Sequence, residues 1–418
     1  MLLGSGLEVI AFQRTRPVFK LLAAEVQSLM DQLKAVGETK LTDAMLNNSK
    51  LPMIMQEASG FDKITMVADK AAPVNAYTLI ITLSKMHTFN SNMQRIFLGS
   101  ADAYNLYRKC NNVLTGQIDL ETGRVGGDFS KIPITIALGY DFLNPKWGFT
   151  AEEVAAILLH ELGHDFTYCY ALHYTCTTNL VLANAAKAIV NAADNQQKHA
   201  IMTDVENSLG IKIDNMAELT NYDKYENYYI TMLAGYRGKV YDALGSRSYN
   251  TNMAEQMADM FAARHGGGPA IVSALNRMYK IFRPNRVMQF VNSLLTTMVY
   301  IALGPLMIPM ALVNLFTNDY IAGSYDLDKD RFIRVRNESI AALKDPELTA
   351  EEKKMLLAGI EQMNAIIART DNDWTVAGKI AILVRGSQRN QLRQKRLQQD
   401  LEALTNNPLY VAAAKYSV

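Results

Sequence analysis

Cysteine is scarce in this chain, and neither sign of charge is in excess. Only Cys110, Cys169 and Cys176 occur in 418 residues, and their spacing matches neither a disulfide scaffold nor a thiolate zinc site. The simplest inference is that the protein resides in a reducing compartment. The formal net charge of +1 gives no bias toward nucleic acid, so we expect no nucleic-acid partner. Internal repeats and low-complexity segments are also lacking, while 49% hydrophobic content suffices for one large or two ordinary cores.

The first ten residues lack the marks of a signal peptide. They carry no basic residue, and Glu8 interrupts their only apolar stretch. We therefore do not expect secretion through a signal peptide.

The most informative feature present is the pentapeptide HELGH at residues 160–164. At about 100° per residue, a four-residue step along a helix brings His160 and His164 to nearly the same face, where both can bind one metal ion. In the H-E-x-x-H pattern of zinc hydrolases the glutamate, here Glu161, is the base that takes a proton from metal-bound water. The pattern also arises by chance, and the alternative is a pair of histidines buried in a helical core.

The residues before this pentapeptide predict a well-defined helix start. Thr150 can cap the helix, and Glu153 can return the capping bond. Phe149 can pack against Val154 as a hydrophobic staple. Residues 154–159 are apolar almost all round, which predicts a helix buried in the centre of a domain. Two histidines and a glutamate are unfavourable to bury there, and a bound metal ion would compensate.

A third protein ligand is expected downstream, because two histidines leave a tetrahedral site short of one. Glu255 and Asp259 are four residues apart in a predicted helix and share one of its faces. In that arrangement Glu255 would be the ligand, and Asp259 would accept the second ring N–H of a ligating histidine. Alternatively, Asn252 caps this helix with Glu255 as its partner, which requires no metal.

Three segments together resemble a known family. They are ILLHELGH at 157–164, the later E-x-x-A-D at 255–259 and FAARHG at 261–266. The chain in these segments is similar to gluzincin metallopeptidases of the HtpX and CAAX-prenyl-protease type, over about residues 100–335. The resemblance implies that His160, His164 and Glu255 bind one zinc ion per chain. It also implies that Glu161 is the general base and that Asp259 orients a ligand from outside the coordination sphere.

A further match concerns the stabilisation of the oxyanion. Members of this family often carry a Ser-His-Pro-Pro-type segment followed by Glu-Arg, and its histidine helps to stabilise the oxyanion. Here Ser324 is followed by Tyr325, and Arg331 keeps the place of the arginine. The resemblance therefore assigns this role to Tyr325, whose phenol can donate a hydrogen bond. Alternatively, Tyr325 is a turn residue and Arg331 belongs to the surface or to a salt bridge.

Residues 126–138 are typical of a strand entered through glycines. Pro133 argues for an edge strand, since proline cannot donate a hydrogen bond to the ladder. An edge beside the metal helix is where an extended peptide can pair as a further strand. We therefore expect Ile132, Ile134 and Ile136 to form a substrate-binding edge, with an ordinary strand of a small sheet as the alternative.

Residues 287–318 contain no charged residue and are long enough to cross a bilayer as a helix. Pro305 and Pro309 would kink or break such a helix. Two interpretations stay open: a membrane span or hairpin, or a buried or interface-forming pair of helices that binds a protein partner. If the segment spans, Arg283 and Arg286 before it keep the catalytic domain cytoplasmic. We expect a location in the cytoplasm, or at a membrane with a cytoplasmic catalytic domain.

These features predict an α+β fold that is mostly helical, with a zincin-like metallopeptidase domain, a small sheet and a helical C-terminal appendage. We expect an N-terminal helical region at 1–100 that packs on the catalytic domain. The metallopeptidase domain is expected at 101–335, including 287–318, and the appendage at 336–418. The long stretch between His164 and Glu255 is expected to be a helical insertion.

Two functions follow from this interpretation. In the first, the protein is a zinc-dependent endopeptidase that hydrolyses a peptide or protein substrate through metal-activated water. In the second, it is a catalytically silent peptidase fold that acts as a scaffold through its apolar segment and helical tail. A scaffold tends to lose part of its site, and this chain keeps all five residues, which favours the enzyme. No oligomeric state is predicted.

Overall fold

A computed structural model describes residues 18–72, 74–79, 116–244, 251–282, 328–346 and 348–370. This part of the chain is mostly helical and has a small sheet, which confirms the α+β class at that level. The zincin-like assignment and the domain boundaries stay predictions. Tyr325 and the apolar segment 287–318 lie outside the described residues. Among the helices that are described, none is both long enough and apolar enough to cross a bilayer.

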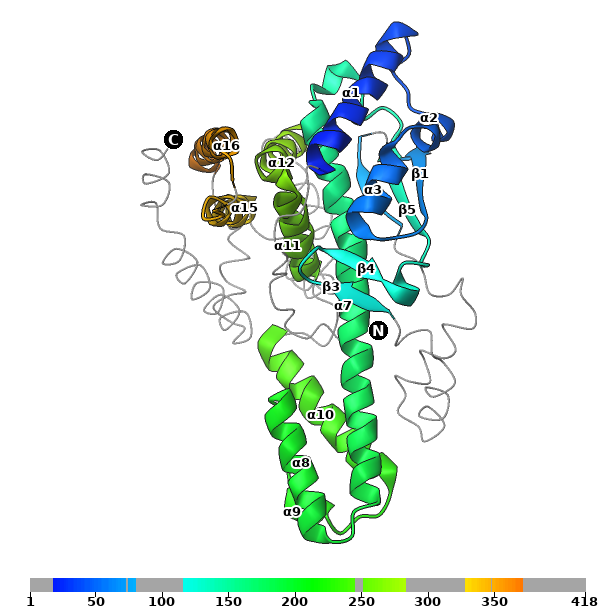
Figure 1. Cartoon of the computed structure of the whole chain (residues 1–418), viewed down its shortest axis with the longest axis vertical. Helices are drawn as coiled ribbons and strands as arrows, with labels where there is room; N and C mark the ends of the chain where they lie inside the picture. The colour runs from blue at the N-terminus through cyan, green and yellow to red at the C-terminus, as the bar shows by residue number, and fades with distance from the viewer. Residues whose placement is uncertain are drawn as a thin grey trace, which may run out of the picture.

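The central element is α7 (Ala151–Val190), a helix of 40 residues that runs lengthwise through the molecule in Figure 1. At roughly 1.5 Å per residue it is about 60 Å long. It begins with the predicted capping box, in which Thr150 Oγ1 accepts a hydrogen bond from Glu153 N at 3.2 Å and Glu153 Oε2 accepts one from Thr150 N at 3.0 Å. Glu153 also accepts hydrogen bonds from Ser273 and Arg277 of α12 (Gly268–Phe282), which fix the first turn of α7 against that helix.

The main sheet has three strands, and β5 (Ile134–Gly139) is the middle one. It pairs in parallel with β1 (Ile64–Asp69) and antiparallel with β2 (Ala76–Thr78). A separate antiparallel ribbon consists of β3 (Gln117–Asp119) and β4 (Arg124–Gly126).

The prediction that Ile132, Ile134 and Ile136 form a substrate-binding edge is wrong. Ile134 and Ile136 lie on the middle strand, which is paired on both sides, and all three side chains are buried. Pro133 lies just before the first residue of β5, where its missing N–H does not interrupt the ladder. Among the described strands, the edges of this sheet are β1 and β2.

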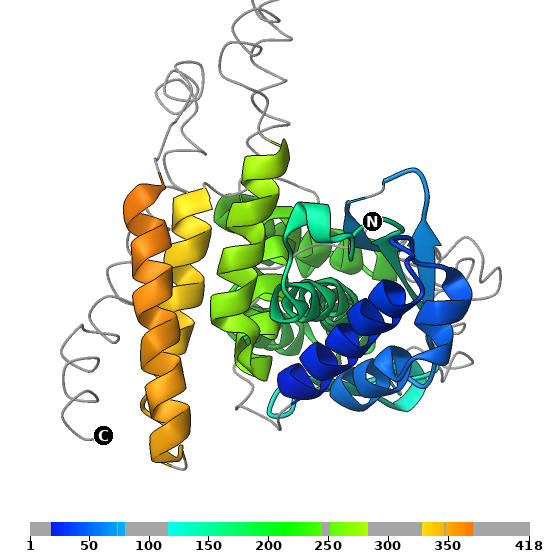
Figure 2. The ribbon, with the colours of Figure 1, turned by 90° about the horizontal axis from the view of Figure 1, so that it is seen from above.

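A hydrophobic core surrounds the N-terminal half of α7, and we call it the first core. On one side of α7 lie the sheet and the N-terminal helices, and on the other lie helices from the C-terminal part of the chain (Figures 1 and 2). The N-terminal helices are α1 (Val18–Ala35), α2 (Asp43–Asn48) and α3 (Leu51–Ser59). The C-terminal ones are α11 (Thr251–Ala262), α12, α15 (Asp328–Ala342) and α16 (Ala350–Arg369). The boundary expected at residue 335 falls within α15, and Val335 and Ile360 both belong to this core.

The C-terminal half of α7 belongs to a second hydrophobic core, which we call the distal bundle. Here α7 packs with α8 (Asn195–Leu209), α9 (Met216–Leu219) and α10 (Tyr225–Leu244), below the first core in Figure 1. Tyr228 and Tyr229 are its largest fully buried side chains. The stretch predicted as an insertion is thus helical through α8, α9 and α10.

Candidate metal centre

The structure brings the three predicted ligands together. His160 and His164 share a face of α7, and Glu255 comes from α11, which packs against that helix. The Nε2 atoms of the two histidines are 3.2 Å apart. Glu255 places Oε2 3.4 Å from His160 Nε2 and Oε1 3.4 Å from His164 Nε2. This cluster could hold a metal ion.

The separations between the donor atoms suit a small metal ion. Bonds of about 2.0–2.1 Å at the tetrahedral angle put neighbouring ligand atoms about 3.3 Å apart. The two Nε2 atoms are 3.2 Å apart and each lies 3.4 Å from a different oxygen of Glu255, so these three separations lie around that value. Imidazole nitrogen and carboxylate oxygen are also donors that first-row metal ions accept. The residues therefore fit one such ion in both chemistry and spacing.

Gly163, the fourth residue of the pentapeptide, explains how α11 can approach α7 so closely. A Cβ at this position would lie 2.8 Å from Ala258 Cα and 2.8 Å from Phe261 Cβ, which is too close for any real contact. Only glycine leaves room for this approach, and the approach brings Glu255 to the histidines. The sequence interpretation assigned no role to this glycine.

Asp259 lies one turn beyond Glu255 on α11 and contacts the far side of the His160 ring. Its Oδ1 is 3.0 Å from His160 Nδ1, and the side chain is fully buried. The Asp259 carboxylate forms an ion pair with the protonated His160 ring at Nδ1, and the Nε2 atom of that ring faces the other donors. The position agrees with the role that the resemblance implies for Asp259.

A buried arginine from α15 joins the cluster. Arg331 pairs with both oxygens of Asp259, through Nε to Oδ2 and through Nη2 to Oδ1 at 2.8 Å. Its Nη2 also lies 3.0 Å from Glu255 Oε2 and 3.5 Å from His160 Nε2. The planar guanidinium thus holds two carboxylates at once. Arg331 is 4% exposed, so the interpretation that it is a surface residue is wrong, and its salt bridges are made within the site.

Burial and neighbouring charges set the protonation of the three donors. Burial lowers the pKa of His160, but Asp259 and Glu255 outweigh burial and raise this pKa to about 10. Burial, together with His160, lowers the pKa of His164 to about 4. Burial raises the pKa of Glu255, but His160 and Arg331 outweigh it and lower this pKa to about 2. His160 therefore carries a proton that a metal ion would displace, whereas His164 and Glu255 are already deprotonated at neutral pH.

Glu161 follows His160 in sequence but contacts a different element, the end of β2. Its Oε2 accepts a hydrogen bond from the backbone N–H of Thr78 at 3.1 Å. The residue is buried, and burial raises the pKa of its carboxyl group to about 7. A carboxyl group with a pKa near neutrality can both accept and return a proton, as a general base must.

Thr78 and Asp165 lie next to the site, and the sequence interpretation missed both residues. The hydroxyl of Thr78 lies 2.8 Å from both carboxyl oxygens of Asp165, which is buried next to His164. Asp165 had a detectable signal, because it lies four residues after Glu161 and so shares its helix face. Thr78 had none, because it ends a strand of three residues and lies 83 positions before Glu161.

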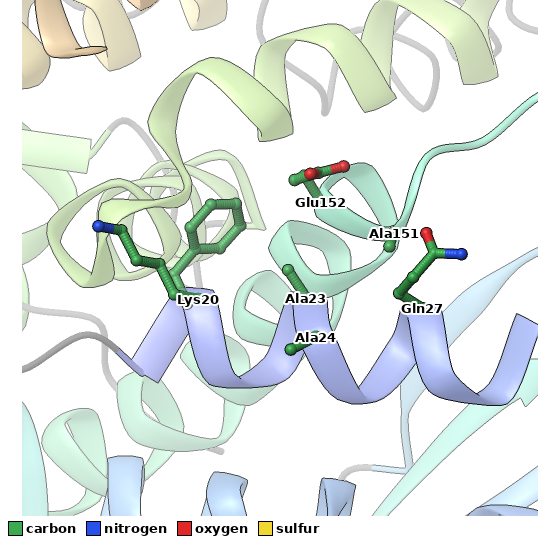
Figure 3. Close-up of a pocket in the computed structure, with 7 residues that line it drawn as sticks. Lys20, Ala23, Ala24, Gln27, Ala151 and Glu152 are labelled. Atoms are coloured by element: carbon green, nitrogen blue, oxygen red, sulfur yellow. The ribbon is translucent and has the colours of Figure 1, made fainter. Parts of the chain in front are cut away.

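A cavity of about 350 Å³ lies elsewhere, between α1 and the first turn of α7 (Figure 3). Lys20 of α1 and Glu152 of α7 are the charged residues of its lining, which includes no member of the metal cluster. At roughly 1.5 Å per residue, Ala151 is about 13 Å from His160 along the helix. The cavity is therefore separate from the candidate metal centre.

The chain matches no protein-family model, no curated protein and no solved structure. The function is therefore inferred from the geometry of the site and from the resemblance of its motifs.

Proposed function

We propose that the protein is a zinc-dependent endopeptidase. The observation that carries this proposal is the convergence of His160, His164 and Glu255 at separations that suit one tetrahedral ion, beside a buried Glu161. Two imidazoles and a carboxylate are a ligand set that zinc uses in catalytic sites, which keep a fourth position for water or substrate. Peptide bonds are proposed as the substrate because the HELGH and E-x-x-A-D segments resemble those of gluzincin peptidases.

The chain's own residues supply the acid–base chemistry. A zinc ion at this site would acidify water and polarise the substrate carbonyl. Glu161, with a pKa of about 7, takes the proton of the attacking water and returns it to the leaving amine. Since the Thr78 N–H donates to Oε2, we assign the proton transfer to Oε1. Tyr325 stays the proposed donor to the oxyanion, on the resemblance alone.

The second candidate function is a scaffold without catalysis. Arg331 is the observation that favours it, because its guanidinium already pairs with Asp259 and Glu255. These ion pairs balance the two buried carboxylates without a metal ion. The two functions differ in whether the protein cleaves peptides, and the scaffold does not need a zinc ion.

Metal analysis and cleavage assays on the purified full chain and its Glu161→Gln variant distinguish the two functions. We expect about one zinc ion per chain in both proteins, since a tetrahedral site with three protein ligands binds one ion and Glu161 is not a ligand. Cleavage of an unfolded protein or of fluorogenic peptides should fall by about 10²–10⁴-fold in Glu161→Gln.

Glu152→Gln is the matched control, because it makes the same chemical change at an exposed position of the same helix. This variant should cleave at the parent rate. Equal cleavage by the parent and Glu161→Gln would remove Glu161 as the base. Absence of both metal and cleavage in the parent would favour the scaffold.

A further inference from the structure

Helix α7 presents two pairs of side chains to two different neighbours. The pair His160 and His164 faces α11, and the pair Glu161 and Asp165 faces the end of β2. Each pair is spaced by four residues, so its members lie one turn apart on the same face. Thr78, the last residue of β2, contacts both members of the second pair. One residue thus joins the carboxyl group of the proposed base to a second buried carboxyl group.

Thr78 makes these contacts with different atoms. Its backbone N–H donates to Glu161 Oε2 at 3.1 Å, and its hydroxyl donates to Asp165 at 2.8 Å. β2 has only three residues, but its pairing with β5 continues beyond both ends, since Leu79 N–H donates to Thr135 O at 2.8 Å and Gly139 N–H donates to Asn75 O at 2.7 Å. These bonds tie the strand to β5, and the bond from the Thr78 hydroxyl to Asp165 ties the end of the strand to α7.

Asp165 is an unfavourable choice for packing alone. It is 4% exposed, so its carboxyl group is almost completely removed from water. An apolar side chain would pack β2 against α7 without the free-energy cost of burying a carboxyl group. Asp165 lies one turn after Glu161 and binds Thr78, the same residue that binds Glu161. This placement points to a role in the chemistry.

On the basis of the peptidase function proposed above, we infer that Thr78 and Asp165 are positioning residues for Glu161. Asp165 anchors the Thr78 hydroxyl, and the Thr78 N–H then holds one oxygen of Glu161, which leaves the other oxygen for proton transfer. A carboxylate held at one oxygen keeps one orientation toward the reacting water, and an error of about 1 Å in such placement lowers the rate by about 10²-fold.

The test is steady-state cleavage by the zinc-loaded full chain and its Thr78→Val variant. Valine keeps the β-branched shape of threonine but cannot bind Asp165. We expect kcat to fall by about 10- to 100-fold, with KM and zinc content unchanged, because Glu161 loses its orientation and substrate binding does not. Thr78→Ser, which keeps the hydroxyl, should recover most of the lost kcat.

Two further variants separate positioning from general damage to the sheet. Tyr77→Phe removes a hydroxyl from the neighbouring residue of the same strand, where it donates to Asp69 at 3.0 Å, and it should keep the parent kcat. Asp165→Leu combined with Thr78→Val should be no slower than the slower single variant, because both changes break the same bond.

The outcomes also separate this inference from the proposed function. If the parent binds zinc and Glu161→Gln is inactive, a Thr78→Val variant with the parent kcat overturns the positioning role alone. Loss of zinc or of folded structure in Thr78→Val would assign Thr78 a structural role and also overturn it. A parent that neither binds zinc nor cleaves peptides would overturn both proposals.

Discussion

The first core and the distal bundle share one helix, α7, but they bury different kinds of side chain. In the first core α7 carries His160, Glu161 and Asp165 into the interior, where Asp259 and Arg331 join them. All five have ionisable groups, and each is less than 9% exposed. In this half of α7 apolar packing therefore surrounds a polar centre.

The distal bundle is held together almost entirely by apolar side chains. Among its described residues, Lys198 is the buried charged side chain. Its Nζ donates to the backbone oxygens of Thr220 and Tyr222 and to Asp223, whose side chain is 92% exposed. The charge of Lys198 is thus compensated at the boundary with solvent.

Packing of α7 therefore does not require buried histidines and carboxylates. The distal half of the helix packs without them, so their presence in the first core needs a separate cause. Clusters of buried ionisable groups with shifted pKa values are typical of functional sites.

Loss of a buried cation should lower the unfolding free energy more than any other change considered. Arg331→Leu leaves Asp259 and Glu255 buried without their guanidinium partner, so the zinc-free protein should lose about 3–5 kcal/mol of unfolding free energy. Lys198→Met in the distal bundle should have a smaller effect, because Asp223 stays hydrated. Urea denaturation of both variants measures this difference, and equal losses would show that the ion pairs of the first core stabilise the protein no more than the contacts of Lys198 do.

A smaller effect is expected where a methyl group is added at a close helix contact. Gly163→Ala should destabilise the protein by about 1–3 kcal/mol and weaken zinc binding, because α11 must move away from α7. Gly235→Ala is the matched change in the distal bundle, where the new Cβ would meet the backbone oxygen of Lys212. It should also destabilise the protein but leave zinc affinity unchanged. Zinc titration of both variants measures the difference, and parent-like affinity in Gly163→Ala would contradict the proposed role of this glycine.

The smallest effect concerns pH. The carboxyl group of Glu161 must be ionised to accept a proton, and burial raises its pKa to about 7. Activity should therefore fall as the pH drops through this pKa, by about tenfold per pH unit below it. A bound cation would favour the ionised form, so the acid limb of kcat/KM should lie no higher than about pH 7.

A pH profile of kcat/KM, with zinc content measured at each point, locates this limb. Zinc content matters because protons also compete for the imidazole ligands. In the distal bundle, the hydrogen bond with Asp223 raises the pKa of Lys198, so its charge is kept throughout this range. A limb that lies well above pH 7 while zinc stays bound would contradict the role of Glu161.

Local patterns in the sequence predicted that His160, His164 and Glu255 lie together. The helix start at Thr150 and Glu153 follows from capping chemistry within four residues. The pair His160 and His164 follows from the helical repeat, and Glu255 follows from the ligand count of a tetrahedral site. These inferences need only residues that are close in sequence, or the number of ligands that a tetrahedral metal ion requires.

Contacts between distant segments could not be predicted in this way. The place of β5 in the middle of its sheet depends on β2, which is too short to show a strand pattern. The bond from Thr78 to Glu161 spans 83 positions and uses a backbone N–H, which every residue except proline offers. Arg331 was noticed through the resemblance, but its two carboxylate partners became visible only when α15 was placed beside α11.

Anomalous diffraction from zinc-loaded crystals would locate the bound ion. We expect one zinc peak within about 2.0–2.2 Å of the Nε2 atoms of His160 and His164 and of a carboxylate oxygen of Glu255. In the same crystals Asp259 should contact His160 Nδ1, and Arg331 should contact Asp259. A peak at another position, or a Glu255 side chain turned away from the zinc ion, would rule out the proposed metal centre.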